Sequence, residues 1–160
     1  SNFNGSGYDI ACADSISPIL YKLEDKKPVI ENTSFNPLFS KNLFFIHLNK
    51  KQNTNIEIKN FYSKKVSANF IEAFSVLTKK FILSNNLSDF QSCIIEHEKL
   101  LSKELNISTV KNTLFSDYDG EIKSLGAWGG DFILAAGPID SPSYFTKKGY
   151  STIIPFKKMF

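Results

Sequence analysis

The chain has 160 residues, 42% of them hydrophobic and fifteen of them phenylalanine, which is enough to fill the core of a globular domain. Its formal net charge is +3, but every basic residue is lysine, so the bidentate arginine contacts that read phosphates and base edges are absent. Composition therefore argues against nucleic-acid binding, and lysine pairs spread along the chain are typical of a solvated surface.

The chain shows no sign of export or membrane insertion. Cys12 and Cys93 match no metal-binding spacing and are too few for a disulfide framework, which favours reduced thiols in a cytoplasmic protein. No apolar run approaches the roughly 20 residues that span a bilayer, and no signal peptide is recognisable. We therefore expect a cytoplasmic protein with no membrane partner.

The first 38 residues predict a small helix followed by a strand pair. Gly5 to Gly7 form a turn, and a helix begins at Tyr8 and runs to Ser15. Residues 17–23 and 28–32 read as two strands across the polar turn "EDKK". Pro37 interrupts the following connector, so we place a domain boundary near it and expect segments 1–38 and 39–160.

The second segment predicts four strands with helices between them. Residues 42–50 read as a buried strand, and apolar residues then recur at helical spacing along two helices joined by "SNN", 84–86. A short helix at 108–117 has Ser108 as its expected N-cap. The remaining strands are expected at 121–125, 131–137 and 150–156, with a helical turn before the last. Four strands with helices on one face make an α+β domain.

Two short motifs carry chemistry. "GAWGG", 126–130, separates two expected strands, and its glycines permit positive φ and let backbone N–H groups face an anion. The alternative is a tight hairpin with a glycine bulge, which needs fewer glycines. Asp9 follows "GSGY", 5–8, and the alternative there is an ordinary acid near a helix N-terminus.

Together, "GSGYDIA" and "IKSLGAWGGDFILA" resemble the GHMP kinase superfamily, which includes galactokinase, homoserine kinase, mevalonate kinase and phosphomevalonate kinase. "GYDIA" is most similar to a bacterial, mevalonate-kinase-like branch of it. The resemblance covers the whole chain, but only as the second half of the fold. It implies a C-terminal domain with a ferredoxin-like, four-stranded antiparallel sheet, preceded by the last helix and strand pair of an ATP-binding N-terminal domain.

The resemblance also implies residue roles. Asp9 falls on the catalytic acid of the family, and the substrate and phosphates are expected to contact two glycine-rich stretches and the end of the strand between them. The residues implied in binding are Gly5, Ser6, Gly7, Lys123, Ser124, Gly126, Ala127, Gly129 and Gly130. A small alcohol substrate, ATP and Mg²⁺ are implied, with no resident metal site in this chain, and the family allows a homodimer.

Two departures separate this chain from the family pattern. Trp128 and Asp131 stand where the late loop usually has glycine or an apolar residue. The upstream phosphate loop of the family, "P-x-x-x-G-L-G-S-S", has no counterpart here, so ATP and Mg²⁺ are expected to be held mainly by an absent N-terminal half. We therefore expect the isolated chain to bind ATP weakly and to turn over no substrate.

Other readings stay open at this stage. Within the kinase class, mevalonate is the first substrate and phosphomevalonate the second. A non-catalytic, small-molecule-binding α+β domain and an RNA-binding sheet are the alternatives from other classes. His97 lies on an apolar helix stripe and is expected to be buried and hydrogen-bonded, while "DYDGE", 117–121, lacks the ligand spacing of a calcium loop and is expected to form a turn.

Overall fold

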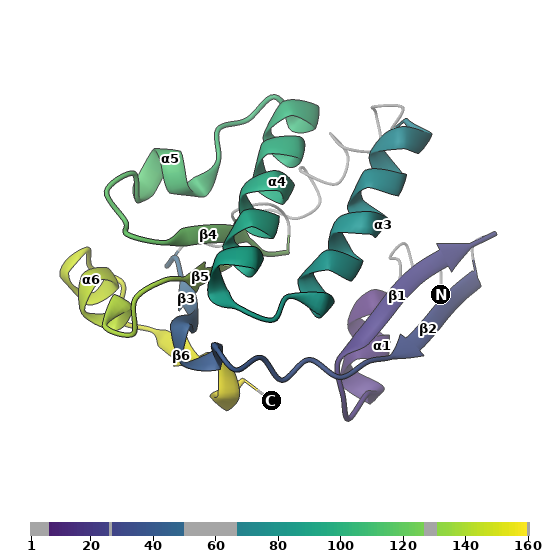
Figure 1. Cartoon of the computed structure of the whole chain (residues 1–160), viewed down its shortest axis with the longest axis horizontal. Coiled ribbons are helices and arrows are strands. Elements are labelled where there is room, and N and C mark those ends of the chain that lie inside the picture. Colours follow the sequence, from purple (N-terminus) through teal and green to yellow (C-terminus); the bar gives the residue numbers. More distant parts are fainter. Residues whose placement is uncertain (1–6, 26, 50–66, 127–130, 160) are drawn as a thin grey trace. The chain divides into compact units, whose positions relative to one another are not determined.

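The computed structural model describes residues 7–25, 27–49, 67–126 and 131–159 (Figure 1). The chain divides into two compact units, Ser1–Asn36 and Pro37–Phe160, and the division falls close to the boundary predicted near residue 38. That the first unit is the tail of an ATP-binding domain stays a prediction.

The first unit contains a short helix and a two-stranded antiparallel sheet. Helix α1 spans Tyr8–Asp14, and strand β1, Ile19–Glu24, pairs with β2, Lys27–Asn32. The predicted four-residue turn was too long: Glu24 and Lys27 are already paired, and Asp25 takes the left-handed conformation with φ 49°. A tight connection of this kind favours residues that tolerate positive φ, as aspartate does.

The second unit is built on a four-stranded antiparallel sheet with the strand order β4-β5-β3-β6. Among the described residues, three helices lie between β3 and β4 and one lies between β5 and β6, so the strands and helices follow the order β-α-β-β-α-β. The α+β class is therefore confirmed. The elements are β3 (Leu43–His47), α3 (Ala68–Leu83), α4 (Leu87–Leu105), α5 (Val110–Leu114), β4 (Glu121–Ser124), β5 (Phe132–Ala136), α6 (Ser141–Lys147) and β6 (Ile153–Pro155), with short 3-10 turns at Ser40–Asn42 and Phe156–Lys158.

Side-chain caps define where the long helices begin. The Ser67 hydroxyl accepts the Phe70 N–H at the start of α3, and the Asn86 amide oxygen accepts the Asp89 N–H at the start of α4. Helix α4 ends where Asn106 turns left-handed, with φ 56°. The two helices lie side by side, as predicted, with aromatic contacts between Phe81 and Phe90 and between Phe74 and His97 (Figure 1).

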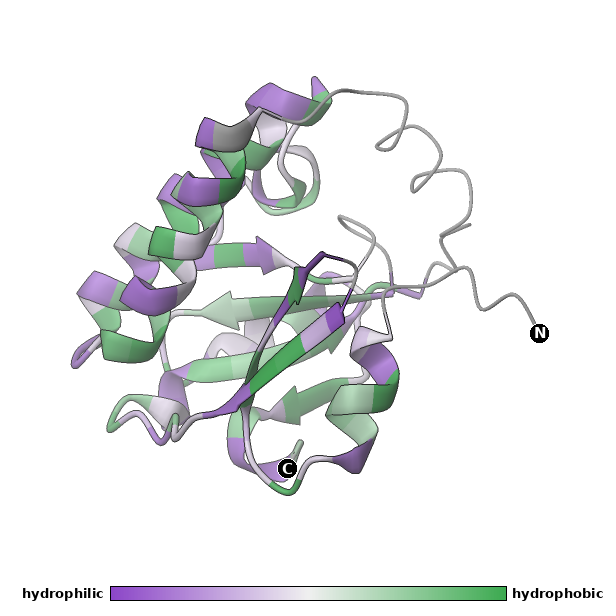
Figure 2. Ribbon diagram, turned by 90° about the vertical axis from the view of Figure 1, so that its right-hand side faces the viewer, coloured by the Kyte–Doolittle hydropathy of each residue, from purple (hydrophilic) through white to green (hydrophobic). Residues whose placement is uncertain are grey.

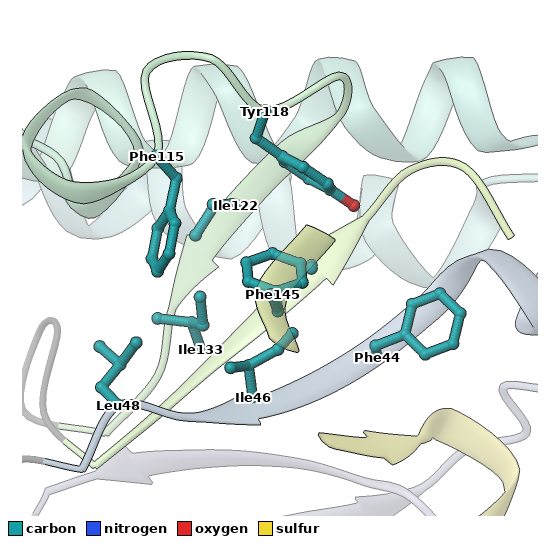
Figure 3. Close-up of a cluster of buried hydrophobic side chains, with 9 residues drawn as sticks. Phe44, Ile46, Leu48, Phe115, Tyr118, Ile122, Ile133 and Phe145 are labelled. Carbon is teal, nitrogen blue, oxygen red and sulfur yellow. The ribbon is translucent and has the colours of Figure 1, made fainter. Parts of the chain in front are cut away.

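The core lies on the face of the sheet that carries Phe44, Ile46 and Ile133 (Figure 3). Phe145 of α6 and Phe115, just after α5, are fully buried against it and meet edge to face at 5.2 Å. The strands of this sheet are mostly hydrophobic, whereas α3 and α4 mix hydrophobic and hydrophilic residues, as expected for partly solvated helices (Figure 2).

Two boundaries differ from the sequence predictions. Thr109 caps α5 by accepting the Asn112 N–H, so the helix begins at Val110 and the predicted cap, Ser108, lies outside it. Either hydroxyl could serve as a cap, and sequence alone does not choose between neighbours. Strand β6 has only three residues, whereas seven were predicted; its ladder with β3 ends at Pro155, which has no N–H to donate. None of the described helices has the length and apolar character needed to cross a membrane.

Candidate functional site

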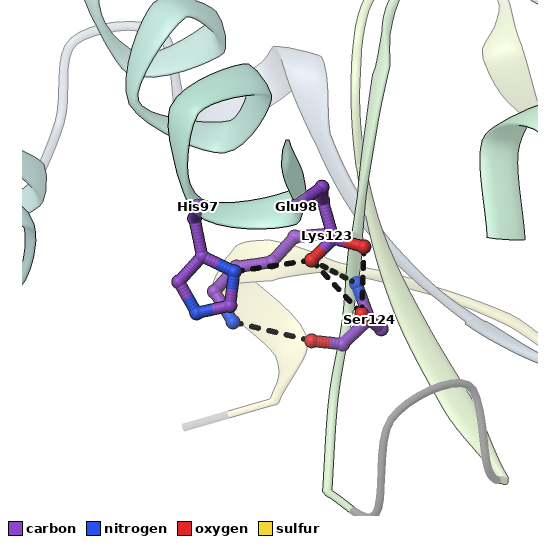
Figure 4. A network of polar contacts seen from close by, with 4 residues as sticks. All are labelled: His97, Glu98, Lys123 and Ser124. Atoms are coloured by element: carbon purple, nitrogen blue, oxygen red, sulfur yellow. Dashed lines mark hydrogen bonds and ion pairs between the residues drawn. The ribbon is translucent and has the colours of Figure 1, made fainter. Parts of the chain in front are cut away.

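A buried polar network joins α4 to β4 directly before the glycine-rich loop (Figure 4). Glu98 is only 6% exposed. Its Oε1 accepts a hydrogen bond from the Ser124 backbone N–H at 3.1 Å, and its Oε2 accepts one from the Ser124 hydroxyl at 2.7 Å. The His97 Nδ1–H donates to the same carboxylate at 3.1 Å. Glu98 therefore fixes the end of β4 to the helix.

The network provides a hydrogen-bond acceptor for the backbone N–H of Ser124. Among the described strands, β4 lies at the edge of the sheet and pairs with β5 alone, so the backbone groups on its other side need other partners. Helix α4 packs along this strand, and its Glu98 accepts the hydrogen bond from the Ser124 N–H. The carboxylate thus closes the sheet edge at the point where the chain enters the segment 126–130.

Electrostatics keep the carboxylate charged. Burial alone would raise the pKa of Glu98, but the hydrogen bonds from His97 and Ser124 and the nearby Lys123 ammonium outweigh burial and hold that pKa below its ordinary value. Burial lowers the pKa of His97, only partly offset by Glu98, so its imidazole is neutral near pH 7. The site therefore contains one fixed negative charge beside one amine.

Lys123 is the cation of this site. Its Nζ donates to the Ser124 carbonyl at 3.1 Å, and the side chain is partly buried. Burial lowers the pKa of the Lys123 ammonium, and the charge of Glu98 works against that shift. A desolvated ammonium held this way is a compact point charge that suits an anionic ligand such as a phosphate group.

The glycine loop begins as predicted. Gly126 has φ 59°, the left-handed conformation that favours glycine, and a Cβ at this position would meet nothing within 4 Å. Ala127, Trp128, Gly129 and Gly130 lie outside the described residues, so their predicted roles stay predictions.

The candidate catalytic acid lies in the first unit. Gly7, at the N-cap of α1, is left-handed with φ 78°, and its carbonyl accepts the Ala11 N–H that starts the helix. Asp9 is exposed in the first turn that follows. The predicted glycine turn feeding an acid into a helix is thus present at Gly7 and Asp9, while Gly5 and Ser6 lie outside the described residues. Lys123, Ser124 and Gly126 belong to the second unit.

Sequence reasoning found His97 and missed Glu98. His97 is hydrogen-bonded, as predicted, and partly buried, with 14% of its side chain exposed. Glu98 follows it and shares a helix face with Ile94 and Leu101, both buried. A single carboxylate on an otherwise apolar stripe was the signal that could have identified it, because a buried acid needs partners.

Other candidates turned out to be structural. The Asp117 carboxylate of "DYDGE" accepts the Tyr144 hydroxyl at 2.7 Å and Lys148 Nζ at 3.0 Å, and these bonds hold its pKa below the ordinary value. Across residues 7–25, 27–49, 67–126 and 131–159, no group of three or more His, Cys, Asp or Glu residues is arranged to hold a metal ion. Cys93 is buried and Cys12 is exposed, both as free thiols.

Comparison with known proteins gives a fold and no family. The chain is similar to the crystal structure of a Lin0012 protein from Listeria innocua, with a TM-score of 0.62 and 15% sequence identity. The match covers 80% of this chain and 41% of that chain, so this chain spans less than half of that protein. No protein-family model matches the chain, and the comparison with curated proteins gave no match. At this identity the likeness shows a shared α+β fold alone.

Proposed function

We propose that the chain is the C-terminal part of an ATP-dependent GHMP-type kinase that phosphorylates a hydroxyl group of a small molecule. The observation that carries the proposal is a polar network close to the left-handed Gly126. Buried Glu98 accepts bonds from the Ser124 N–H and hydroxyl, and Lys123 Nζ donates to the Ser124 carbonyl. A lysine followed by a glycine in the left-handed conformation suits a phosphate-bearing ligand. It coincides with the stretch that resembles the late loop of the family.

The proposed division of roles follows from the chemistry of phosphoryl transfer. Such a reaction needs positioning and charge stabilisation more than covalent help from the protein. Asp9, exposed at the start of α1, would orient the substrate hydroxyl and accept its proton. Lys123 and the amides from Gly126 onward would contact the anionic groups, and Ser124, whose hydroxyl donates to Glu98, would act by holding Lys123 in place. ATP and Mg²⁺ would be held mainly by residues upstream of this chain.

Mevalonate is the proposed first substrate, and phosphomevalonate or another substrate of the family is second. Lys123 is the one cation of this network, which fits a substrate without a phosphate group of its own better than one that carries it. This assignment rests on the sequence motif "GYDIA" and on the single lysine in the network, Lys123.

A substrate panel tests the proposal. The full-length protein that contains this chain is assayed for ADP release with mevalonate, phosphomevalonate, homoserine and galactose, in the presence of Mg²⁺. We expect turnover with mevalonate or phosphomevalonate and none with the 160-residue chain alone. Saturable binding of one of these alcohols without ADP release from any of them would favour the non-catalytic, small-molecule-binding alternative instead.

A lysine variant links the panel to the site. Lys123→Gln removes the charge and keeps a chain of similar length, and we expect it to lower kcat/KM at least about tenfold. Lys80→Gln is the control, because Lys80 forms an exposed ion pair with Glu96 on the outer surface of the helix pair. Equal activity of both variants would argue against a role of Lys123 in binding the anionic groups.

A further inference from the structure

The second unit contains a cavity of about 420 Å³ that the proposed kinase reaction does not use. It lies between α4, α5 and β4, and its volume is within the range of small-molecule sites, which is roughly 300–1,000 Å³. Ile95 and Ile122 give it an apolar part, and hydroxyl and amide groups come from Ser102, Thr109 and Asn112.

The charged lining of the cavity is mostly basic. Lys99 and Lys103 stand one turn apart on the same face of α4, and both are exposed at the cavity. In the part of the chain that the structure describes, neither of them forms an ion pair. Lys99 and Lys103 repel each other electrostatically, and an anion bound between them would relieve this repulsion.

The other charged groups of the lining are already paired. Lys111 Nζ and Glu121 Oε1 are 2.7 Å apart, with about a quarter of each side chain exposed. Glu98 also borders the cavity, but its carboxylate accepts the bonds from Ser124 and His97. Lys99 and Lys103 therefore remain as the groups with charge available to a ligand.

We propose that this cavity binds a small organic anion, with carboxylate or phosphate groups between Lys99 and Lys103 and its carbon skeleton against Ile95 and Ile122. Lysine binds such groups as a point charge, so the site would accept both kinds of anion. Lys99 and Lys103, on which the inference rests, have no part in the proposed kinase reaction, although Glu98 borders both this cavity and the network with Ser124.

Titration at constant ionic strength tests the proposal. Citrate and inorganic pyrophosphate are added separately to the 160-residue chain, and backbone amide shifts are followed by NMR, with glycerol as the uncharged comparison. We expect saturable shifts in α4 around Lys99 and Lys103 and around Lys111 and Glu121, and none with glycerol. Saturation by citrate alone, or by pyrophosphate alone, would support the site and tell a carboxylate ligand from a phosphate ligand.

Two variants make the result specific. Lys103→Gln should weaken binding at least about tenfold, because it removes one of the two charges that bind the anion. Lys147→Gln is the control, since Lys147 is an exposed lysine at the end of α6. Both substitutions are on the surface, and the amide spectra report whether each variant is folded. Shifts that stay linear with concentration, or equal weakening in both variants, would overturn the proposal.

Discussion

Glu98 shows at the scale of one residue how a buried charge organises this molecule. Its carboxylate accepts bonds from the Ser124 backbone, the Ser124 hydroxyl and the His97 ring. A buried carboxylate is unfavourable unless such donors surround it, so the three bonds are what permits the charge. Removing the charge of Glu98 should therefore destabilise the fold.

Glu98→Gln should lower the free energy of unfolding by about 2 kcal/mol, because charge-assisted hydrogen bonds to buried groups are replaced by weaker neutral ones. Urea denaturation followed by circular dichroism measures the change. Glu96→Gln is the matched control two positions earlier on the same helix. Its side chain is 51% exposed and pairs with Lys80, so its loss should change stability by less than about 0.5 kcal/mol. Similar changes in the free energy of unfolding for the two variants would contradict a stabilising role of the hydrogen bonds to Glu98.

His97 should make stability depend on pH. Burial holds its pKa below the ordinary 6.5, so on unfolding the imidazole takes up a proton that the folded protein does not bind. The stability from the neutral, buried ring is fully present above pH 6.5 and is lost as pH falls below it. Glu98, whose pKa is held below 4.5, adds a second loss as pH falls below that value.

His97→Gln tests the first of these losses. Glutamine keeps an N–H donor for Glu98 but cannot titrate, so the variant should lose less stability than wild type between about pH 7 and about pH 5. Below pH 4.5 both proteins should lose stability further, because Glu98 is present in each. Parallel curves for the two proteins from pH 7 to pH 5 would show that His97 does not carry the effect.

At the scale of elements, the segment before β4 packs closely against the segment that joins β5 to α6. Gly120, just before β4, and Gly137, just after β5, approach each other, and Tyr118 lies over both. A Cβ on Gly137 would overlap the Tyr118 hydroxyl and come within 3.0 Å of the Asp119 carbonyl oxygen. The Tyr118 hydroxyl also shares a buried hydrogen bond with Ser141 at 2.7 Å, which holds the start of α6.

Gly137→Ala should therefore cost about 1–3 kcal/mol of stability through overpacking. Tyr118→Phe removes the hydroxyl that the new Cβ would overlap, at the expense of the bond to Ser141. We expect the double variant to be less destabilised than the sum of the two single variants, measured by thermal unfolding of all four proteins. Simple additivity would mean that the hydroxyl is not what excludes a side chain at Gly137.

Element prediction from the sequence succeeded where periodicity was long. Helices α3 and α4 and strand β3 lie where the apolar spacing placed them, because each buries one continuous stripe or run. Short elements were less well defined. The cap of α5 moved from Ser108 to Thr109, and β6 shortened to Ile153–Pro155, because tertiary contacts decide such ends.

The candidate site was predicted only in part, for a physical reason. Lys123 and Gly126 lie three positions apart in one short stretch, so its resemblance to the family's late loop was enough to single them out. Glu98 lies 26 positions from Ser124, and their contact exists only once α4 packs along β4. Single-sequence reasoning sees spacing along one element and cannot see which residues different elements bring together.

At the scale of the whole molecule, the chain is two units with different proposed contributions to one reaction. The unit Pro37–Phe160 carries Lys123 and Gly126, and the unit Ser1–Asn36 carries Asp9. The fold of a Lin0012 protein, of which this chain spans 41%, supports the α+β architecture and leaves the activity as a proposal. The role of Asp9 is the part of that proposal on which catalysis depends most directly.

Turnover of Asp9→Asn in the full-length protein, with mevalonate and ATP, is the measurement that tests this role. Asparagine keeps the shape of the side chain but accepts no proton, so kcat should fall at least about 100-fold while ATP binding, followed by calorimetry, is unchanged. Asp14→Asn, an exposed acid at the other end of α1, is the control and should retain wild-type activity. Turnover by Asp9→Asn equal to that of Asp14→Asn would contradict Asp9 as the catalytic acid.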